Sequence, residues 1–489
     1  MIHNDTEKLI FEQGRAGRVG VDVEGVCLIE LDHALPEELR RGPLDGFPEV
    51  TEPEMVRHYT RLSQRNVGID DTFYPLGSCT MKYNPRMNEA VANMKGFTQL
   101  HPAMPVKDTQ DAFRLLWELE EMLKEICGMD AFTLNPVAGA HGEVTGLKII
   151  RAAIRARGEK RDKVLIPTSA HGTNPASAML AGFTPVNIEV NPDGSVNFEA
   201  LEKALDENVA AMMITNPSTL GLFETNIKKI ADMLHAKGAF LYCDGANLNA
   251  LVGIARPGDM GFDVIQTNMH KTFSTPHGGG GPGAGPVGVK KELVPFLPYP
   301  QIEKFFSTPG IFIPMTDEHS IGRIHSYYGN FLVLLRAYVY LRTMGARGLR
   351  EVAEAAVLNA NYLRVSLRDI GYRIPFDRPC MHECLIMHDG LPKEIKTLDI
   401  AKRLMDKGFH PPTMDFPLHG CFLIEPTETE TKETLDAFIK AMYEILIESE
   451  VSPELLHDAP HITPVKRVDD VAANRPKNLN LRWNSNKAV

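Results

Sequence analysis

The chain has 489 residues, of which 43% are hydrophobic, enough to build the buried cores of two or more domains. Its formal net charge of −11 at pH 7 excludes a general nucleic-acid binder, because such proteins need a dense basic surface for phosphates. The seven cysteines are scattered and predict neither a disulfide framework nor a structural zinc site. No segment has the pattern of a leader peptide or a membrane-spanning helix, so we expect a cytoplasmic protein that does not bind membranes.

The first part of the chain, residues 1–105, is rich in proline, glycine and short polar pieces. This composition predicts an N-terminal arm with short helices. A helical pattern follows, with apolar residues at helical spacing and Gly128 after its end. Up to residue 300, apolar runs then alternate with helical patterns, which predicts a large α/β domain over 106–300 with a mostly parallel sheet flanked by helices. The expected strands begin near residues 131, 163, 184, 210, 239, 262 and 285.

The remaining part, residues 301–489, has a different pattern. A proline-rich connector, residues 294–314, leads into long helical patterns. Further along, the sequence predicts a strand pair near 383–388 and 420–424, and then one more helix. We expect a smaller C-terminal α+β domain, followed by a polar tail with too few apolar residues to form a core.

In a parallel sheet, ligands bind at the carboxyl ends of the strands, so the loops after the strands are the places to look for chemistry. Gly139, Ala140 and Gly142 stand at a predicted helix start after the first strand. Free backbone N–H groups there can hold a phosphate, although a close-packed turn gives the same pattern. His171 lies in the loop after the second strand, where an imidazole can stack on a flat ligand or lie exposed.

Two further loops carry polar residues. Asn216, Ser218 and Thr219 offer hydrogen-bonding groups around a sharp turn, or ordinary turn chemistry. Asp244 ends a hydrophobic strand, and Ala246 just after it is small enough to let a planar ring approach. A partly desolvated carboxylate at this place is suited to pair with a protonated ring nitrogen.

Lys271 follows one helix and one strand later, again at the end of a strand. The expected edge of the sheet therefore carries an anion-binding helix start, a stacking imidazole, a carboxylate and a lysine. Pyridoxal phosphate needs each of these: N–H donors for its phosphate, a lysine for a Schiff base with its aldehyde, and an acidic partner for its pyridine nitrogen. The combination predicts this cofactor and no metal.

The glycine run over 278–281, seven residues after Lys271, suggests a nucleotide loop at first sight. A phosphate loop of the GxxxxGK[ST] type would place the lysine after the glycines, and Pro276 and Pro282 break any helix here. A dinucleotide fingerprint would open the first strand–helix unit. We therefore interpret the run as pliable backbone behind a reactive lysine.

Several segments together resemble the glycine decarboxylase, or P-protein, family of the glycine cleavage system: "PLGSCTMKYNP" (75–85), "SAHGTNPASA" (169–178), "NPSTLGLFE" (216–224), "YCDGANLNALVG" (242–253), "DVIQTNMHKTFSTPHGGGGPGAGPVGV" (263–289) and "EPTETETKETLDAFIKAM" (425–442). The resemblance covers nearly the whole chain. It implies the aspartate-aminotransferase-like fold, fold type I of pyridoxal-phosphate enzymes. One small departure is His141, where much of the family has glutamine.

In length the chain resembles subunit 2 of the split form, in which two homologous half-size polypeptides pair as an α2β2 heterotetramer. That subunit keeps the cofactor lysine, here Lys271. The resemblance implies decarboxylation of glycine, release of CO2 and transfer of the aminomethyl group to the lipoyl arm of the H protein, an activity of the glycine dehydrogenase (aminomethyl-transferring) class.

The resemblance also assigns roles to the predicted site residues. Lys271 would carry the cofactor, Asp244 would keep its ring nitrogen protonated, His171 would stack on the ring, and His270 would contact the phosphate or transfer a proton. The remaining candidates for cofactor contacts are Gly139, Ala140, Ser218, Thr219 and Ala246. Cys79 lies in a segment expected to line the site or the subunit interface, where a structural role is favoured over a redox role.

Two alternatives of different class stay open. One is another fold type I enzyme, an amino-acid decarboxylase or a cysteine desulfurase; the latter needs a mobile reactive cysteine, for which Cys380, Cys384 and Cys421 show no suitable context. The other is a non-catalytic scaffold subunit that only completes its partner's site. The presence of Lys271 argues against a scaffold.

Overall fold

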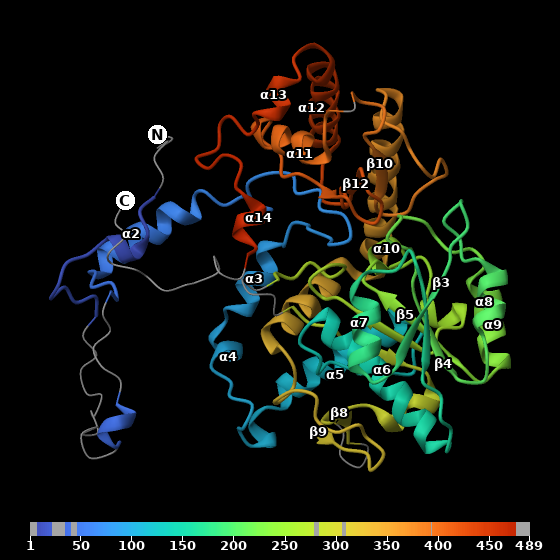
Figure 1. The fold of residues 1–489 in the computed structure, drawn as a ribbon. Coiled ribbons are helices and arrows are strands. Elements are labelled where there is room, and N and C mark those ends of the chain that lie inside the picture. The colour runs from blue at the N-terminus through green and yellow to red at the C-terminus, as the bar shows by residue number, and fades with distance from the viewer. Residues whose placement is uncertain are drawn as a thin grey trace. The chain divides into compact units, whose positions relative to one another are not determined.

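The computed structural model describes residues 7–21, 35–40, 46–277, 283–305, 310–392 and 394–475. The glycines of the run 278–281 lie outside these residues, so the interpretation of that run stays a prediction. The chain divides into two compact units, Phe73–His457 and the pair of segments Met1–Thr72 and Asp458–Val489. The larger unit holds both of the sheets that matter for the site (Figure 1).

The main sheet has seven strands in the order β1-β7-β6-β5-β4-β2-β3. Strands β3, β2, β4, β5 and β6 run parallel to one another, whereas β7 is antiparallel to both β6 and β1. The prediction of a mostly parallel sheet is thus confirmed, and β7 is its one exception among the described strands. The bounds are β1 (Ala131–Thr133), β2 (Lys163–Pro167), β3 (Thr184–Ile188), β4 (Val209–Thr215), β5 (Phe240–Gly245), β6 (Val264–Thr267) and β7 (Val287–Val289).

Helices cover both faces of this sheet, because successive strand residues point to opposite sides. In β4, Ala211 and Met213 pack into one core with α6 and α7, while Met212 and Ile214 pack into another core with α5, α8 and α9. The bounds are α5 (Gln110–Cys127), α6 (Gly139–Ala156), α7 (Thr173–Leu180), α8 (Phe198–Ala204) and α9 (Ile227–Ala236). Before them come α3 (Arg86–Ala92), α4 (Lys95–Thr98) and the 3₁₀ turn η3 (Val106–Asp108).

A smaller antiparallel sheet has the order β10-β12-β11. The predicted strand pair is confirmed: Cys384 of β10 lies opposite Ile424 of β12. These strands pack into a separate core with the helices that follow them. The bounds are β10 (Cys384–Met387), α11 (Thr397–Asp406), β11 (Thr413–Met414), β12 (Cys421–Ile424), α12 (Lys432–Val451) and α13 (Glu454–His457).

The long helix α10 (Phe331–Asp369) connects the two sheets. Leu334 and Leu341 pack into the core of the main sheet, whereas Leu363 and Leu367 pack into the core of the small sheet. The two helical patterns seen in the sequence are confirmed: α10 consists of two helices that meet at a kink, where Gly345 has a non-helical backbone (φ 60°, ψ −177°). A left-handed φ of this kind suits glycine, which has no Cβ.

The proline-rich connector is more ordered than its sequence suggests. It contains a two-stranded hairpin of β8 (Gln301–Lys304) and β9 (Phe312–Met315). Proline is tolerated on a strand edge, and we missed the hairpin because its prolines weakened the strand pattern. The other 3₁₀ turns described in the larger unit are η4 (Leu248–Ala250), η5 (Pro257–Met260) and η6 (Lys291–Phe296).

The smaller unit contains η1 (Ile10–Glu12), η2 (Glu37–Leu39), α2 (Glu52–Ser63) and α14 (Asp470–Ala473). A capping box starts α2: the Glu54 carboxylate accepts from both the backbone N–H and the hydroxyl of Thr51, each at 2.9 Å. In the described part of the chain, no helix has the length and apolarity needed to cross a membrane. The domain boundaries at 105/106 and 300/301 stay a prediction.

Candidate active site

The loops singled out in the sequence meet at one edge of the main sheet. Strands β2, β4, β5 and β6 are parallel, and β1 runs in the same direction as β6 because β7 is antiparallel to both. The carboxyl ends of all five therefore lie on the same side. The loops that leave them carry Gly139, His171, Thr219, Ala246 and Lys271.

Asp244 is nearly fully buried at the end of β5. Its Oδ1 accepts from Gln266 Nε2 at 2.6 Å and from the backbone N–H of Ala246 at 3.1 Å. Its Oδ2 accepts from Asn174 Nδ2 at 3.0 Å and from Thr215 Oγ1 at 3.4 Å. Donors from α7, β4 and β6 thus fix the carboxylate in place.

Glu143 of α6 is a second buried acid beside Asp244. It accepts from Thr173 Oγ1 and from Ser177 Oγ, both at 2.8 Å, and from Asn174 Nδ2 at 3.3 Å. Burial raises the pKa of Glu143, and the neighbouring Asp244 raises it further. The three hydrogen bonds from Ser177, Thr173 and Asn174 oppose this rise in the pKa of Glu143.

Lys271 lies in the turn after β6, and the residue is 8% exposed. Its Nζ donates to the carbonyl oxygen of Ser78 at 2.9 Å. Ser78 has a left-handed backbone (φ 64°), and the segment that contains it also pairs with the small sheet through Leu76 and Ile424. Residues 75–82 are expected to line the site or the subunit interface, and this contact places Ser78 of that segment beside the lysine.

Lys82 of the same segment is a buried cation that the sequence analysis missed. Its Nζ donates to Glu428 Oε1 at 2.7 Å, and to the carbonyl of Thr272, next to Lys271, at 2.8 Å. It also lies 3.2 Å from Asn249 Oδ1 and 3.4 Å from the hydroxyl of Tyr340. Lys82 thereby joins the lysine loop, the loop after β5, α10 and the loop after β12. Nothing in its local sequence separates it from an exposed lysine.

His171 is half-buried in the loop after β2. Its Nδ1 lies 2.9 Å from Thr173 Oγ1, and its ring meets the Phe416 ring edge-on at 5.9 Å. Burial lowers the pKa of His171; Lys271 lowers it further, and Asp244 opposes this. The imidazole is therefore favoured in its neutral form.

His270 precedes Lys271 and is mostly buried. Its Nδ1 accepts from the backbone N–H of Ala284 at 3.4 Å, and its ring meets His277 edge-on at 4.9 Å. Burial, with smaller effects from His277 and Lys271, lowers the pKa of His270 to about 3. The ring is therefore neutral at physiological pH and offers a hydrogen bond to a phosphate, not a positive charge.

The loop after β4 forms hydrogen bonds to the loop after β2 and within itself. The buried Thr219 donates its hydroxyl to the Ser169 carbonyl and so ties this loop to the one that carries His171. The hydroxyl of Ser218 accepts from Leu220 N–H at 3.3 Å. Asn216 closes the loop on itself, because its Oδ1 accepts from the backbone N–H of Glu224 at 3.0 Å. Asn216 and Thr219 thus each have a hydrogen-bond partner within the protein.

Gly139 and Ala140 form the first turn of α6. The first N–H groups of an α-helix have no partner within it and point toward an anion placed at its end. There is little room around this turn: a Cβ on Gly139 would lie 2.7 Å from Asn268 Oδ1, and a Cβ on Gly142 would lie 2.5 Å from the Gly285 carbonyl. Glycine is needed at both places.

The polar groups at this edge fit a bound pyridoxal phosphate. Among the described residues, buried oxygens of Asn174, Gln266, Thr267 and Asn268 have no hydrogen-bond partner. Buried polar atoms in proteins are normally paired, so these atoms are available to a polar ligand. The helix start, the carboxylate of Asp244 and the amine of Lys271 supply the donor, acceptor and nucleophile that this cofactor requires.

Sequence reasoning missed Glu143, Asn174 and Gln266 around Asp244. One signal was available for Gln266: it lies opposite Asp244 in the parallel β5–β6 register, so the two side chains share a face. The contacts of Glu143 and Asn174 depend on the packing of α6 and α7 over the sheet.

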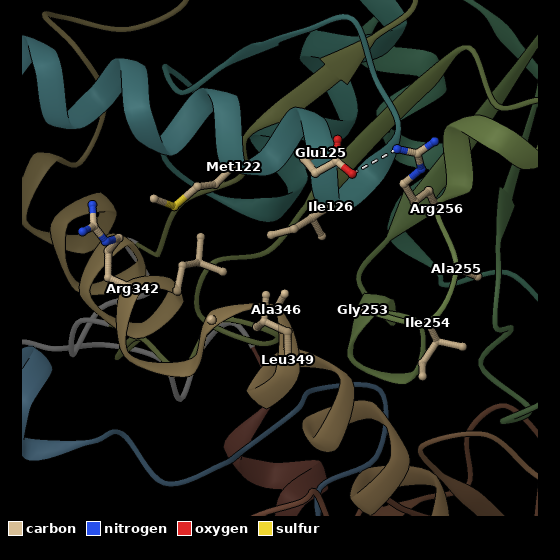
Figure 2. A pocket seen from close by; sticks show the side chains of 12 residues that line it. Met122, Glu125, Ile126, Gly253, Ile254, Ala255, Arg256, Arg342, Ala346 and Leu349 are labelled. Atoms are coloured by element: carbon tan, nitrogen blue, oxygen red, sulfur yellow. Dashed lines mark hydrogen bonds and ion pairs between the residues drawn. The ribbon is translucent and has the colours of Figure 1, made fainter.

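A cavity of about 510 Å³ lies elsewhere, between α5, α10 and the loop after η4 (Figure 2). Figure 2 shows apolar side chains such as Met122 and Leu349 around it, with Arg342 and an ion pair of Glu125 and Arg256 at its border. It shares none of its lining residues with the edge described above. The chemistry of the side chains, not the size of the cavity, therefore identifies the candidate site.

The sequence matches two known families. Residues 27–300 match the family described as "Glycine cleavage system P-protein", and residues 352–460 match "Glycine dehydrogenase, C-terminal domain". The relatives include proteins named "Probable glycine dehydrogenase (decarboxylating) subunit 2". The protein from Caldanaerobacter subterraneus subsp. tengcongensis is 53% identical over 97% of this chain and 98% of its own length, and that from Thermosipho africanus is 54% identical over 95% and 98%.

Solved structures show the same fold at low identity. A glycine decarboxylase (P-protein) of the glycine cleavage system, in inhibitor-bound form, superposes with a TM-score of 0.74 at 23% identity, covering 86% of this chain and 95% of the other. An aspartate aminotransferase from Thermus thermophilus gives a TM-score of 0.56 at 14% identity, covering 77% and 99%. The predicted aspartate-aminotransferase-like fold is confirmed. By its sequence along nearly the whole length, this chain belongs to the glycine cleavage system P-protein family.

Proposed function

We propose that this chain is a pyridoxal-phosphate-dependent glycine decarboxylase that transfers the aminomethyl group of glycine to a lipoyl arm and releases CO2. The observation that carries the proposal is the placement of Lys271 and Asp244 at the same edge of the main sheet, in a member of the P-protein family. Relatives along the whole chain bear the name glycine dehydrogenase (decarboxylating) subunit 2.

Each predicted residue then has a defined task. When bound, pyridoxal phosphate supplies an electron-withdrawing ring that accepts the electron pair left when the carboxylate bond of glycine breaks. Lys271 holds the cofactor through its amine, and Asp244 keeps a proton on the ring nitrogen. His171 covers a face of the ring, and the first turn of α6, at Gly139 and Ala140, offers N–H groups to the phosphate.

Burial of the site supports this chemistry. Four of its residues are buried, namely Lys271, Asp244, Asn268 and Gln266. Few water molecules can reach such a site. Water that did reach it could donate a proton to the reacting carbon and so compete with the transfer of the aminomethyl group. His270 and Ala246 are proposed contacts at the border of the cofactor, with Ser218 and Thr219 on the loop beside it.

The cysteines argue against a desulfurase. Burial raises the pKa of Cys380 to about 12, and it also raises the pKa values of Cys384 and Cys421. The thiolate is the reactive form, so these buried thiols are poor nucleophiles.

Borohydride reduction followed by peptide mapping tests the proposed function. The reagent reduces the bond between lysine and cofactor to a stable amine, so we expect a pyridoxyl group on the peptide that contains Lys271 and a complete loss of turnover in Lys271→Ala. The exposed Lys203 in α8 provides a matched control, and Lys203→Ala should keep both the adduct and the activity. A wild-type chain that gains no adduct at Lys271 would refute the catalytic role and favour a scaffold.

We further propose that the partners are glycine, a homologous P-protein subunit 1 in an α2β2 heterotetramer, and a lipoylated H protein. The number in the relatives' name, "subunit 2", supports a partner subunit. A cytoplasmic location is part of the same proposal.

A further inference from the structure

Two glutamates lie side by side at the edge of the small sheet. Glu383 immediately precedes β10 and Glu425 immediately follows β12, and the residues next to them, Cys384 and Ile424, are paired in the ladder. A ring nitrogen of His382 and a carboxyl oxygen of each glutamate lie within 4.8 Å of one another. All three side chains are fully or almost fully buried. We name His382, Glu383 and Glu425 the acid cluster.

Each glutamate is fixed through one oxygen. Glu383 Oε2 accepts from the backbone N–H of Ser78 at 2.7 Å, and Glu425 Oε1 accepts from the hydroxyl of Thr80 at 2.6 Å. Within the described parts of the chain, the second oxygen of each glutamate and both ring nitrogens of His382 have no hydrogen-bond partner. The distance between His382 Nε2 and Glu383 Oε1 is 3.6 Å, too long for a hydrogen bond. The acid cluster therefore contains buried polar atoms that have no partner among the described residues, and a proton or a ligand group can bind to these atoms.

Ser78 connects the acid cluster to Lys271. Its carbonyl accepts from Lys271 Nζ and its N–H donates to Glu383. Burial raises the pKa of Glu383 far above its ordinary value and the pKa of Glu425 to about 7, and it lowers the pKa of His382 to about 3. A neutral imidazole and two adjacent buried acids thus hold at least one proton near neutral pH. The other charged or titratable groups that act on the pair are Lys271, Lys82, Glu428 and Cys79.

We propose that Glu383 and Glu425 share a proton and form the proton-exchange site for the two nitrogens that compete for the cofactor, those of the substrate and of Lys271. The ammonium group of glycine has to lose a proton before its nitrogen can replace the lysine. One N–H bond of the ammonium breaks, its electron pair stays on nitrogen, and an O–H bond forms on the carboxyl pair. When Lys271 is released, that O–H bond breaks and the proton moves to Nζ. The proposal rests on the function proposed above.

A divalent cation is the competing occupant, because two carboxylates and an imidazole are common metal ligands. The position of Lys271 disfavours it: the ammonium acts electrostatically on all three members of the acid cluster and would repel a second cation. A proton, by contrast, binds to a carboxylate of the pair and gives a neutral carboxyl group, so it adds no positive charge beside Lys271.

The first test follows the absorbance of the bound cofactor after rapid mixing of the holoenzyme, with its partner subunit, and glycine over a range of pH. In the wild type, the rate should rise with pH through an apparent pKa near 7, because the pair accepts a proton only when one carboxyl is free. Glu425→Gln and Glu383→Gln should lower the rate about tenfold or more above neutral pH and remove this inflection. Glu433→Gln, an exposed site at the start of α12, is the matched control and should behave as the wild type.

The second test measures thermal unfolding of the apo chain against pH. The pKa of Glu425 is raised from 4.5 in the unfolded chain to about 7 in the folded chain. At pH values between these two, the folded chain therefore keeps the proton on Glu425, whereas the unfolded chain has released it. Stability from this group is therefore present at low pH and is lost as pH rises through about 7. We expect Tm to fall less steeply over this range in Glu425→Gln than in the wild type.

The outcomes separate the two proposals. A wild type without any absorbance response to glycine contradicts the proposed function, while the unfolding test still decides whether the pair holds a proton. A normal response whose pH profile is the same in wild type and in both glutamine variants overturns the proton-exchange role alone. Loss of the response after treatment with a chelator overturns it in favour of a metal site.

Discussion

At the scale of single residues, Asp244 shows how the site is prepared before a ligand arrives. Four donors fix its two oxygens, two of them on the neighbouring strands β4 and β6 and one on α7. A carboxylate held in this way need not reorient when charge develops on a nearby ring nitrogen, which is the condition for effective electrostatic stabilisation.

Asp244→Asn tests this role. The amide keeps the size of the side chain and removes its negative charge, so the ring nitrogen loses the partner that keeps it protonated. We expect kcat to fall by about 100-fold or more, as when a charge-stabilising contact is removed. The absorbance spectrum of the bound cofactor should change as well, which separates the effect from unfolding.

Asp111→Asn, on the exposed side of α5, is the control and should leave the rate and the spectrum unchanged. An Asp244→Asn enzyme that turns over at the wild-type rate would show that the ring nitrogen has another partner.

At the scale of elements, the packing of α6 on β5 positions the first turn of α6, which we propose holds the cofactor phosphate. The hydroxyl of Tyr242 in β5 donates to the carbonyl of Gly142 at 3.2 Å and lies 3.4 Å from the carbonyl of Glu143. A Cβ on Gly146 would lie 2.5 Å from a ring carbon of Tyr242. Glycine at 146 thus lets the helix approach the strand that carries Asp244.

Gly146→Ala should push α6 away from the sheet. Overpacking of a buried contact costs about 1–3 kcal/mol, which denaturant unfolding can measure. The shift also moves the first turn of the helix, so we expect weaker binding of pyridoxal phosphate, measured by equilibrium titration of the apo chain.

Gly96 in α4 gives the comparison, because an added Cβ there meets no atom within 4 Å. Gly96→Ala should change the unfolding free energy much less than Gly146→Ala does. It should leave the affinity for pyridoxal phosphate unchanged. Equal effects of the two substitutions would contradict the packing argument.

Some helices and strands can be predicted from local sequence patterns alone. The strands of the main sheet and helices α5, α6 and α9 are visible in the sequence, because apolar periodicity directly reflects which face is buried. The β8–β9 hairpin was missed because pairing between strands overrides the local effect of proline. The kink at Gly345 separates the two helical patterns that the sequence shows, and the two helices of α10 pack into different cores.

At the scale of the whole molecule, the segment 73–85 and α10 bring the small sheet to the cofactor edge. Lys82 connects Thr272 of the lysine loop with Glu428 of the small-sheet region, and Ser78 connects Lys271 with Glu383. Both connections are buried and involve charge, so removal of one partner leaves an uncompensated group. The two sheets are therefore coupled at the lysine.

The assembly gives a prediction at this scale. We expect the chain mixed with its homologous subunit 1 to form an α2β2 complex, measured by light scattering, and exchange of labelled bicarbonate into glycine to appear only with this subunit and lipoylated H protein present. The physical reason is that a homologous half can complete the site of a cofactor-bearing half without adding a second lysine. Full exchange by the chain alone would contradict the heterotetramer, and no exchange with both partners present would contradict the function.

The sequence alone determined the fold class, the place of the site at the strand ends, and Lys271 and Asp244 as its central candidates. These follow from local patterns: periodicity marks buried faces, and a polar residue directly after a buried strand marks the ligand edge. Tertiary structure alone decided the surroundings, namely the donors on Asp244, the buried Lys82 and the acid cluster beside Lys271. Their roles arise from contacts between residues far apart in the chain, and the same side chains in another packing would be ordinary surface groups.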